Sequence, residues 1–265
     1  MKLLSPAISR LARIRYWRIE QWIQNPIEAQ REVLQELVSF GQYTEIGRKY
    51  GMSKLFNVRD FKKAIPIHTY EDLKPYIERL MLGEQNLLWN TPVKWFAKSS
   101  GTTNDKSKFI PITEESLSYN HFQASKDVLS MYYNFNPESD LLTGKGLLIG
   151  GSHQINPLNE EAMYGDLSAV LFQNTPIWAN WIRTPDLTVA LMDEWETKIE
   201  AIAQQTLYDD VTSMSGVPTW TLVLLKRILE ITGKKNIQEV WPNIELYLHG
   251  GVSFTPYKEQ FNKII

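Results

Sequence analysis

The chain has 265 residues, of which 43% are hydrophobic and nine are tryptophan, so it can bury a large core in one domain or two ordinary ones. Its formal net charge is −2 and 22% of its residues are charged, so a basic nucleic-acid-binding surface is not indicated. The absence of cysteine excludes disulfides, thiol nucleophiles and zinc–thiolate sites. None of the four histidines lies four residues from another, which excludes a two-histidine metal site on a helix.

The first segment, residues 4–23, reads as a basic and roughly amphipathic helix. Four arginines interrupt its apolar residues, so it has no signal-peptide core, and no apolar run in the chain is long enough to span a bilayer. The helix could lie on a membrane surface or bind a partner, or it could bury its apolar side within the protein. We favour burial and expect a cytoplasmic protein with no membrane partner.

Most of the first 90 residues are expected to be helical. Asn25-Pro26 begins a helix well, because asparagine is a good N-cap and proline is tolerated where no N–H donor is needed. Thr69 and Asp72 have the spacing of a capping box, and Pro75 marks either the true start of that helix or a kink. The expected helices cover residues 4–23, 26–41, 44–52, 58–64 and 69–82.

After residue 90 the pattern changes to strands that alternate with helices, which indicates an α/β fold. Strands are expected at residues 93–97, 109–112, 145–149, 210–214 and 244–248, and helices at 116–133, 188–207, 219–232 and 256–264. No linker or repeat divides the chain. We therefore expect one domain over residues 1–265, with a helical portion at 1–90 and an α/β core at 91–265.

The segment from Phe96 to Pro111 carries the clearest chemical signal. It consists of a strand, a hydroxyl-rich loop with Gly101, two lysines and a second strand. Glycine permits a tight turn, and hydroxyl and backbone N–H donors in such a turn can converge on one anion. Lys106 or Lys108 adds a compact positive charge suited to phosphate. The pattern fits a nucleoside triphosphate that must lose pyrophosphate.

Other interpretations of this loop stay open on the residues alone. The usual P-loop needs a second glycine and a lysine that leads into a helix, whereas here the lysines lead into a strand. A surface hairpin rich in turn residues has the same composition. A serine nucleophile at Ser99 or Ser100 lacks the G-x-S-x-G elbow.

Beyond composition, Ser99-Ser100-Gly101-Thr102-Thr103 with Ser107-Lys108 and Pro111 resembles the phosphate loop of the adenylate-forming superfamily, which includes acyl-CoA ligases, luciferases and adenylation domains. Residues 42–51 and 65–84 narrow the resemblance to the GH3 (auxin-responsive promoter) family, in a bacterial-type member. Plant members of that family are acyl acid–amido synthetases. The implied fold is α/β: the N-terminal large-domain portion of the superfamily fold, with mixed sheets flanked by helices and incomplete at the C-terminus.

Two further segments are similar to elements of this family. Residues 215–220 resemble a turn near the acyl pocket, and residues 248–257 resemble a double-glycine element that lets backbone approach the adenylate. Each could instead be an ordinary turn or a strand–loop–helix junction. Both follow expected strands, where ligands of α/β sheets often bind. The residues implied to line the acyl and adenylate pocket are Gly216, Val217, Pro218, His249, Gly250, Gly251 and Val252. For His249 alone, core burial or strand capping is the simpler interpretation.

The resemblance implies ATP-dependent adenylation of a carboxylic acid, followed by amide formation with an amino acid. Magnesium is expected with ATP, and no metal ligand is assigned within the chain. Lys108 is the implied catalytic residue, which offsets charge on the leaving group. The residues implied to bind ATP and its phosphates are Ser99, Ser100, Gly101, Thr102, Thr103 and Lys106.

The sequence also departs from the family pattern. The Tyr…Ser/Thr-Glu motif, the ribose-binding aspartate and the C-terminal domain with its lysine do not occur in residues 1–265. We therefore expect a truncated form that is inactive alone. Ala124 and Asp127 occupy positions at which the plant enzymes recognise their acids, but they differ in type from the plant residues. Auxin or jasmonate is therefore not inferred as the substrate. The alternatives are thioester formation with coenzyme A and a non-catalytic nucleotide-binding fragment.

Overall fold

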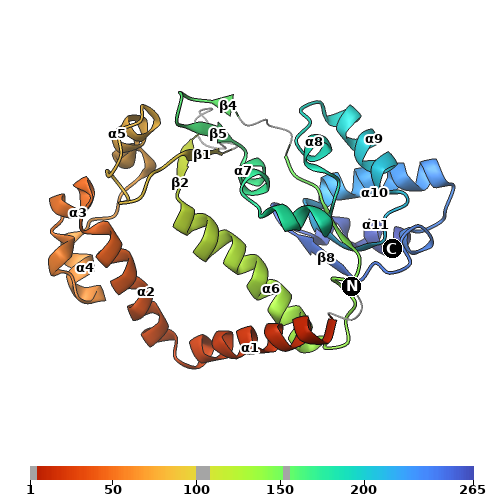
Figure 1. The fold of residues 1–265 in the computed structure, drawn as a ribbon, viewed down its shortest axis with the longest axis horizontal. Coiled ribbons are helices and arrows are strands. Elements are labelled where there is room, and N and C mark those ends of the chain that lie inside the picture. Colours follow the sequence, from red (N-terminus) through yellow and green to blue (C-terminus); the bar gives the residue numbers. More distant parts are fainter. Residues whose placement is uncertain (1–4, 100–107, 152–155) are drawn as a thin grey trace. The chain divides into compact units, whose positions relative to one another are not determined.

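The structure is a computed structural model that describes residues 5–99, 108–151 and 156–265, and within these residues helices accompany two four-stranded sheets (Figure 1). The α-helices are α1 (Ser5–Gln24), α2 (Pro26–Gly41), α3 (Glu45–Lys49), α4 (Val58–Ala64), α5 (Tyr70–Met81), α6 (Phe122–Phe135), α7 (Leu167–Gln173), α8 (Leu187–Ala190), α9 (Trp195–Thr206), α10 (Pro218–Thr232) and α11 (Lys258–Ile264). The strands are β1 (Trp95–Lys98), β2 (Phe109–Ile112), β3 (Lys145–Leu148), β4 (Asn156–Pro157), β5 (Met163–Gly165), β6 (Arg183–Thr184), β7 (Val211–Gly216) and β8 (Leu246–His249). A π-helix spans Ser116–His121, and short 3-10 helices occur at Met52–Lys54, Ile177–Trp181, Ile237–Glu239 and Thr255–Tyr257.

The first sheet has the strand order β2-β1-β5-β4 and is mixed. β1 pairs antiparallel with β2, its neighbour in the chain, and parallel with β5. Phe96 of β1 is fully buried and belongs to a core that also contains Ile77 and Leu80 of α5. This core fixes β1 and β2, the two strands that flank the predicted phosphate loop.

The second sheet has the order β6-β3-β7-β8, and each of its pairs is parallel. Parallel strands need helical crossovers, and α9 and α10 supply them before and after β7. Both helices bury apolar side chains against the sheet, in a core centred on Trp241, Met214 and Leu224. The carboxyl ends of β3, β7 and β8 therefore meet along one edge of this sheet.

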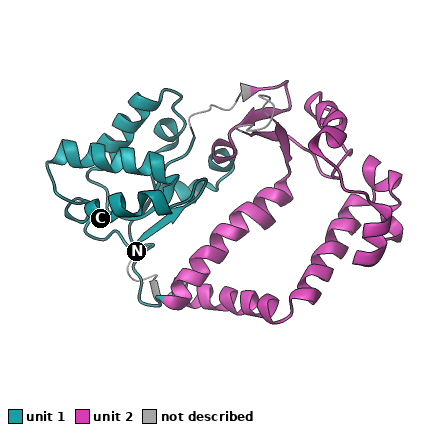
Figure 2. Ribbon diagram, turned by 180° about the vertical axis from the view of Figure 1, so that it is seen from behind, with its two compact units in different colours: residues 1–9, 136–154, 171–265 teal, residues 10–135, 155–170 magenta. Residues whose placement is uncertain are grey.

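The chain divides into two compact units that are discontinuous in sequence (Figure 2). Unit 1 comprises residues 1–9, 136–154 and 171–265 and contains the parallel sheet. Unit 2 comprises residues 10–135 and 155–170 and contains the mixed sheet. The domain division expected from the sequence stays a prediction.

Local sequence signals account well for the helix ends. Thr69 and Asp72 form the expected capping box of α5, which runs through Pro75 from Tyr70 without a later start. Thr44 caps α3 by accepting a hydrogen bond from the Gly47 N–H. The C-terminal end of α10 lies at Gly233, which adopts a φ of 65°.

Other expectations were wrong in detail. The single helix expected at 188–207 is two helices, because the carboxylate of Glu194 accepts hydrogen bonds from the N–H groups of Glu196 and Thr197 and starts a new helix at Trp195. The helix expected from Ser116 begins as a π-helix and becomes α-helical at Phe122. The short elements β4, β5, β6 and α7 were not predicted.

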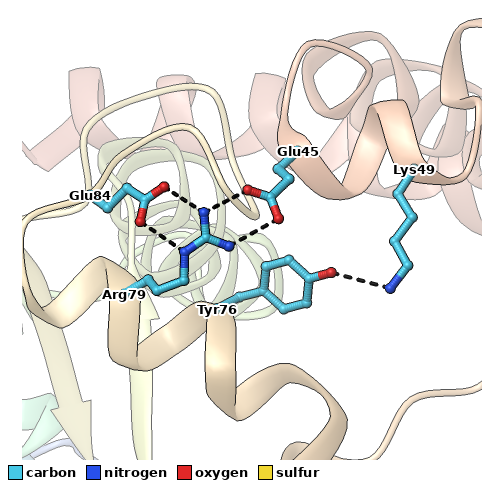
Figure 3. Close-up of polar contacts among 5 residues, drawn as sticks. All are labelled: Glu45, Lys49, Tyr76, Arg79 and Glu84. Atoms are coloured by element: carbon cyan, nitrogen blue, oxygen red, sulfur yellow. Dashed lines mark hydrogen bonds and ion pairs between the residues drawn. The ribbon is translucent and has the colours of Figure 1, made fainter.

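Two of the segments that carry the family resemblance are joined by one arginine (Figure 3). Arg79 of α5 donates hydrogen bonds to both carboxylate oxygens of Glu45, at 2.9 and 2.7 Å, and also pairs with Glu84. Nearby, the Lys49 ammonium donates to the Tyr76 hydroxyl at 3.2 Å. These motifs therefore brace α3 against α5 within unit 2.

None of the helices in the described part of the chain combines the length and the apolar character needed to cross a membrane.

Candidate nucleotide and acyl site

The hairpin of β1 and β2 holds both ends of the predicted phosphate loop. The Ser99 N–H donates to the Lys108 carbonyl at 2.8 Å, and the Lys108 N–H lies 3.3 Å from the Ser99 hydroxyl oxygen. The loop therefore leaves and re-enters the sheet at one place, with a hydroxyl on one side and an ammonium on the other. Ser100, Gly101, Thr102, Thr103 and Lys106 lie outside the described residues.

Tyr70, the first residue of α5, supports this hairpin. Its hydroxyl accepts a hydrogen bond from the Phe109 N–H at 3.0 Å, and its ring lies 5.2 Å from the Lys108 ammonium. The Phe109 ring in turn forms a T-shaped contact with the Tyr164 ring, with centroids 5.5 Å apart. A cation over an aromatic face is favourable, so Tyr70 orients the lysine as well as the strand. This role of Tyr70 could not be predicted from local sequence, because the contact joins residues 39 positions apart.

In unit 1, the turn at the end of β7 holds three residues predicted for the acyl pocket. Pro218 is buried at the first position of α10, and Val217 lies just before it in an extended conformation. The Tyr247 hydroxyl of β8 donates to the Gly216 carbonyl at 3.1 Å and lies 3.0 Å from the Thr221 hydroxyl. Burial raises the pKa of Tyr247, which keeps this phenol protonated and able to donate.

The double-glycine element meets the β7 turn directly. Gly251 has a φ of 81°, and a Cβ placed on it would lie 3.3 Å from Val217 Cγ2. A Cβ placed on Gly250 would meet no atom within 4 Å. A shallow pocket of about 360 Å³ is lined by Ser215, Gly216, Val217, Leu248, His249 and Gly250. The structure thus brings together residues of both predicted segments at the carboxyl ends of β7 and β8.

His249 is exposed, so core burial does not describe it. Its ring stacks on Phe254 at a centroid distance of 4.4 Å and lies 5.5 Å from the Tyr247 ring. The imidazole therefore forms one wall of the pocket and is positioned by aromatic contacts. Val252 is 44% exposed and lies outside the residues that line the pocket.

Ala124 and Asp127, the two positions that correspond to acid-recognising residues of the plant enzymes, lie on α6 in unit 2. Asp127 accepts hydrogen bonds from Arg15 of α1 at 2.6 and 2.9 Å and from Gln123 at 2.8 Å. Burial raises the pKa of Asp127, but the bonds from Arg15 and Gln123 outweigh it and hold the pKa below its usual value. Asp127 is therefore an ionised member of an ion pair, while Ala124 is exposed.

The described residues provide no cluster of side chains that would assign a magnesium site. Within them, no group of three or more histidine, aspartate or glutamate side chains could hold a metal ion.

Comparison with known proteins assigns the chain to a family. A model of the GH3 family N-terminal domain matches residues 15–265. Indole-3-acetic acid-amido synthetase GH3.2 of Arabidopsis thaliana is 35% identical over 100 residues, which are 37% of this chain and 18% of that protein. Jasmonoyl-L-amino acid synthetase JAR4 of Nicotiana attenuata is 34% identical over 128 residues, which are 47% of this chain and 21% of that protein.

Solved structures show the same fold. GH3.15 acyl acid amido synthetase superposes with a TM-score of 0.71 at 17% identity, over 92% of this chain and 53% of that one. AtGH3.15 acyl acid amido synthetase in complex with 2,4-DB gives a TM-score of 0.73 at 18% identity, over 89% of this chain and 50% of that one. This chain spans about half the length of these solved chains.

One mixed and one parallel sheet, both accompanied by helices, define an α/β protein that shares its fold with about half of the GH3.15 acyl acid amido synthetase chain. The chain belongs to the GH3 family, and its residues 15–265 correspond to the N-terminal domain of that family.

Proposed function

We propose that this chain is the acid-activating part of an ATP-dependent acyl acid–amido synthetase. In the first step, a carboxylate oxygen of the substrate attacks the α-phosphorus of ATP, and the bond to the β-phosphate breaks to release pyrophosphate. In the second step, the nitrogen of an amino acid attacks the acyl carbon. The bond to AMP then breaks, and the amine loses a proton. The names of the relatives, which are amido synthetases of acyl acids, support this assignment.

The observation that carries the proposal is the hairpin end at Ser99 and Lys108. A hydroxyl and an ammonium flank one short loop, and Tyr70 holds the ammonium in place. Preorganised donors of this kind stabilise charge that develops on phosphate oxygens. In the proposed site, the hydroxyls of Ser99, Ser100, Thr102 and Thr103 with Lys106 bind the β- and γ-phosphates, Gly101 allows the turn, and Lys108 offsets the leaving-group charge.

The proposed binding site for the acid is the pocket at the strand ends of unit 1. Gly216, Val217, His249 and Gly250 line this pocket. Gly251 packs against Val217, Pro218 fixes the turn behind Val217 at the start of α10, and Val252 follows beyond the lining. Magnesium, when bound with ATP, would supply further charge neutralisation at the phosphates.

The test uses the full-length protein that carries this chain and measures acid-dependent exchange of labelled pyrophosphate into ATP. We expect Lys108→Met and Ser100→Ala each to lower the exchange rate about 100-fold, as for loss of one transition-state donor. Lys94→Met is the matched control, because Lys94 is exposed and lies just before β1, at the end of this strand away from the loop. Exchange at the wild-type rate in both site variants would overturn the proposal.

The acceptor is tested separately. The full-length protein is incubated with the purified acyl-adenylate and either amino acids or coenzyme A, and the products are identified by mass spectrometry. We expect an amide. Formation of a thioester alone would contradict the amido synthetase and indicate an acyl-CoA ligase. Release of free acid alone would contradict both the amido synthetase and the acyl-CoA ligase.

A further inference from the structure

Lys198 is a fully buried lysine that the proposed chemistry does not use. It lies in the first turn of α9, on the same helix face as the buried residues Ile199 and Ile202. Removing an ammonium from water is costly, and an apolar side chain such as methionine would fill a similar volume without that cost. A charge at this position therefore calls for a role other than filling the core.

The ammonium reaches the chain just beyond β3. Lys198 Nζ donates to the Gly151 carbonyl at 2.7 Å and to the Gly150 carbonyl at 3.3 Å. These two glycines follow β3 closely, and neither has a side chain that could anchor the end of that strand. Lys198 supplies that anchor from a neighbouring helix, 47 and 48 positions away in sequence.

The topology explains why a helix residue reaches this edge. α9 precedes β7, so the end of α9 lies near the start of β7 and its first turn lies near the carboxyl ends of the strands. The contact between Trp195 of α9 and Trp220, which lies in the first turn of α10, agrees with this arrangement, with ring centroids 5.2 Å apart.

The anchored strand end touches the β7 turn. The Ile149 N–H, one residue before Gly150, donates to the Ser215 carbonyl at 2.9 Å. A Cβ on Gly216 would lie 3.0 Å from Ile149 Cβ and 3.3 Å from the Ile149 carbonyl oxygen. A displacement of residues 149–151 would therefore be transmitted to Gly216 and Val217, which line the pocket.

We propose that Lys198 is a positioning residue for the acyl pocket: its buried ammonium fixes the carbonyls of Gly150 and Gly151 and so holds the wall formed by Gly216 and Val217. This role rests on the proposed function for its effect on substrate, but its effect on the backbone can be measured without any activity.

The backbone test uses the 265-residue chain labelled with ¹⁵N-glycine. Its 14 glycines give a resolvable set of amide resonances. Lys198→Met should shift those of Gly150, Gly151 and Gly216 and leave that of Gly233, at the far end of α10, in place. Ile202→Val is the matched control for a core substitution on the same face of α9, and it should leave all four in place.

Because the chain has no cysteine, Lys198→Cys creates a single thiol. Alkylation of the unfolded variant with 2-bromoethylammonium restores an ammonium of nearly the length of lysine, whereas alkylation with 1-bromopropane gives an uncharged side chain of the same size. After refolding, the aminoethyl form should recover the wild-type glycine resonances and the propyl form should not. Identical spectra of the two forms, or unshifted resonances in Lys198→Met, would overturn the proposal.

In the full-length protein, Lys198→Met should raise the KM for the acid by about tenfold or more and leave the affinity for ATP unchanged, since small misplacements of a substrate-positioning wall are costly. Unchanged KM for the acid in an active protein would contradict the role of Lys198. Failure of the wild-type protein to form an adenylate would instead contradict the proposed function, and the glycine spectra would still decide the positioning role.

Discussion

Gly250 and Gly251 are neighbours in the chain, but the structure demands glycine at only one of them. Gly251 has a positive φ and closes against Val217, whereas Gly250 has a φ outside the left-handed region and open space where a Cβ would lie. The double glycine is therefore not one flexible unit. Its second residue sets the turn, and its first leaves the pocket open.

We expect Gly251→Ala to lower the free energy of unfolding by about 1–2 kcal/mol, the cost of a side chain in the left-handed region. The Cβ would also press on Val217 and displace the pocket wall. Urea unfolding of the two single variants measures the difference, with Gly250→Ala expected within about 0.5 kcal/mol of wild type. Equal losses in both variants would contradict the different roles of the two glycines.

Individual residues also show where sequence reasoning reaches its limit. The flanks Ser99 and Lys108 and the turn residues at 216–218 could be located from local patterns, because loops and strand ends leave a signature in residue type. Tyr70, Tyr247 and Lys198 could not, since each acts on a segment at least 26 positions away and has no local motif. Hydroxyls and ammonium groups that support a site through tertiary contacts look like ordinary helix and strand residues in a sequence.

Helices and strands were predicted best where capping chemistry is strong. The capping box at Thr69 and the glycine stop at Gly233 placed their helix ends closely. The break before α9 was missed because Glu194 acts as its N-cap, a role more typical of serine, threonine, aspartate or asparagine. The strands of two or three residues were missed because periodicity needs longer segments.

The ion pairs that join α3 and α5 give a pH-dependent contribution to stability. Hydrogen bonds from Arg79 lower the pKa of Glu45 and of Glu84 below the ordinary value of 4.5. The unfolded state then binds more protons than the folded state near that pH, so the contribution is full above pH 4.5 and is lost as the pH falls through the lowered values.

Arg79→Met should accordingly lower the urea midpoint at pH 7, and the gap to wild type should narrow at pH 3. Lys74→Met serves as the control, because its ammonium lies 3.9 Å from Glu71 and from Glu78 and is poorly placed for strong pairing. A gap for Arg79→Met that is the same at both pH values would show that the ion pairs do not cause it.

At the scale of the whole molecule, each compact unit has a hydrophobic core of its own. Phe96 lies in the core of unit 2 and Leu224 in the core of unit 1, and both are fully buried. Separate cores allow separate cooperative unfolding, in which the loss of packing in one unit need not open the other.

Phe96→Ala should cost about 3–5 kcal/mol and Leu224→Ala about 2–5 kcal/mol, as for other large-to-small core substitutions. Hydrogen exchange monitored by mass spectrometry should show lost protection in residues 70–98 for the first variant and in 195–232 for the second. Loss of protection across both units in either variant would mean that they unfold as one.

The order in which the chain visits the two units limits how they can be separated. Unit 1 takes residues from three stretches of sequence and unit 2 from two, so the polypeptide passes between them four times. No continuous piece of the gene encodes either unit. A gene fragment that encodes all of one unit therefore also encodes residues of the other, so neither unit can be produced alone as one uninterrupted segment.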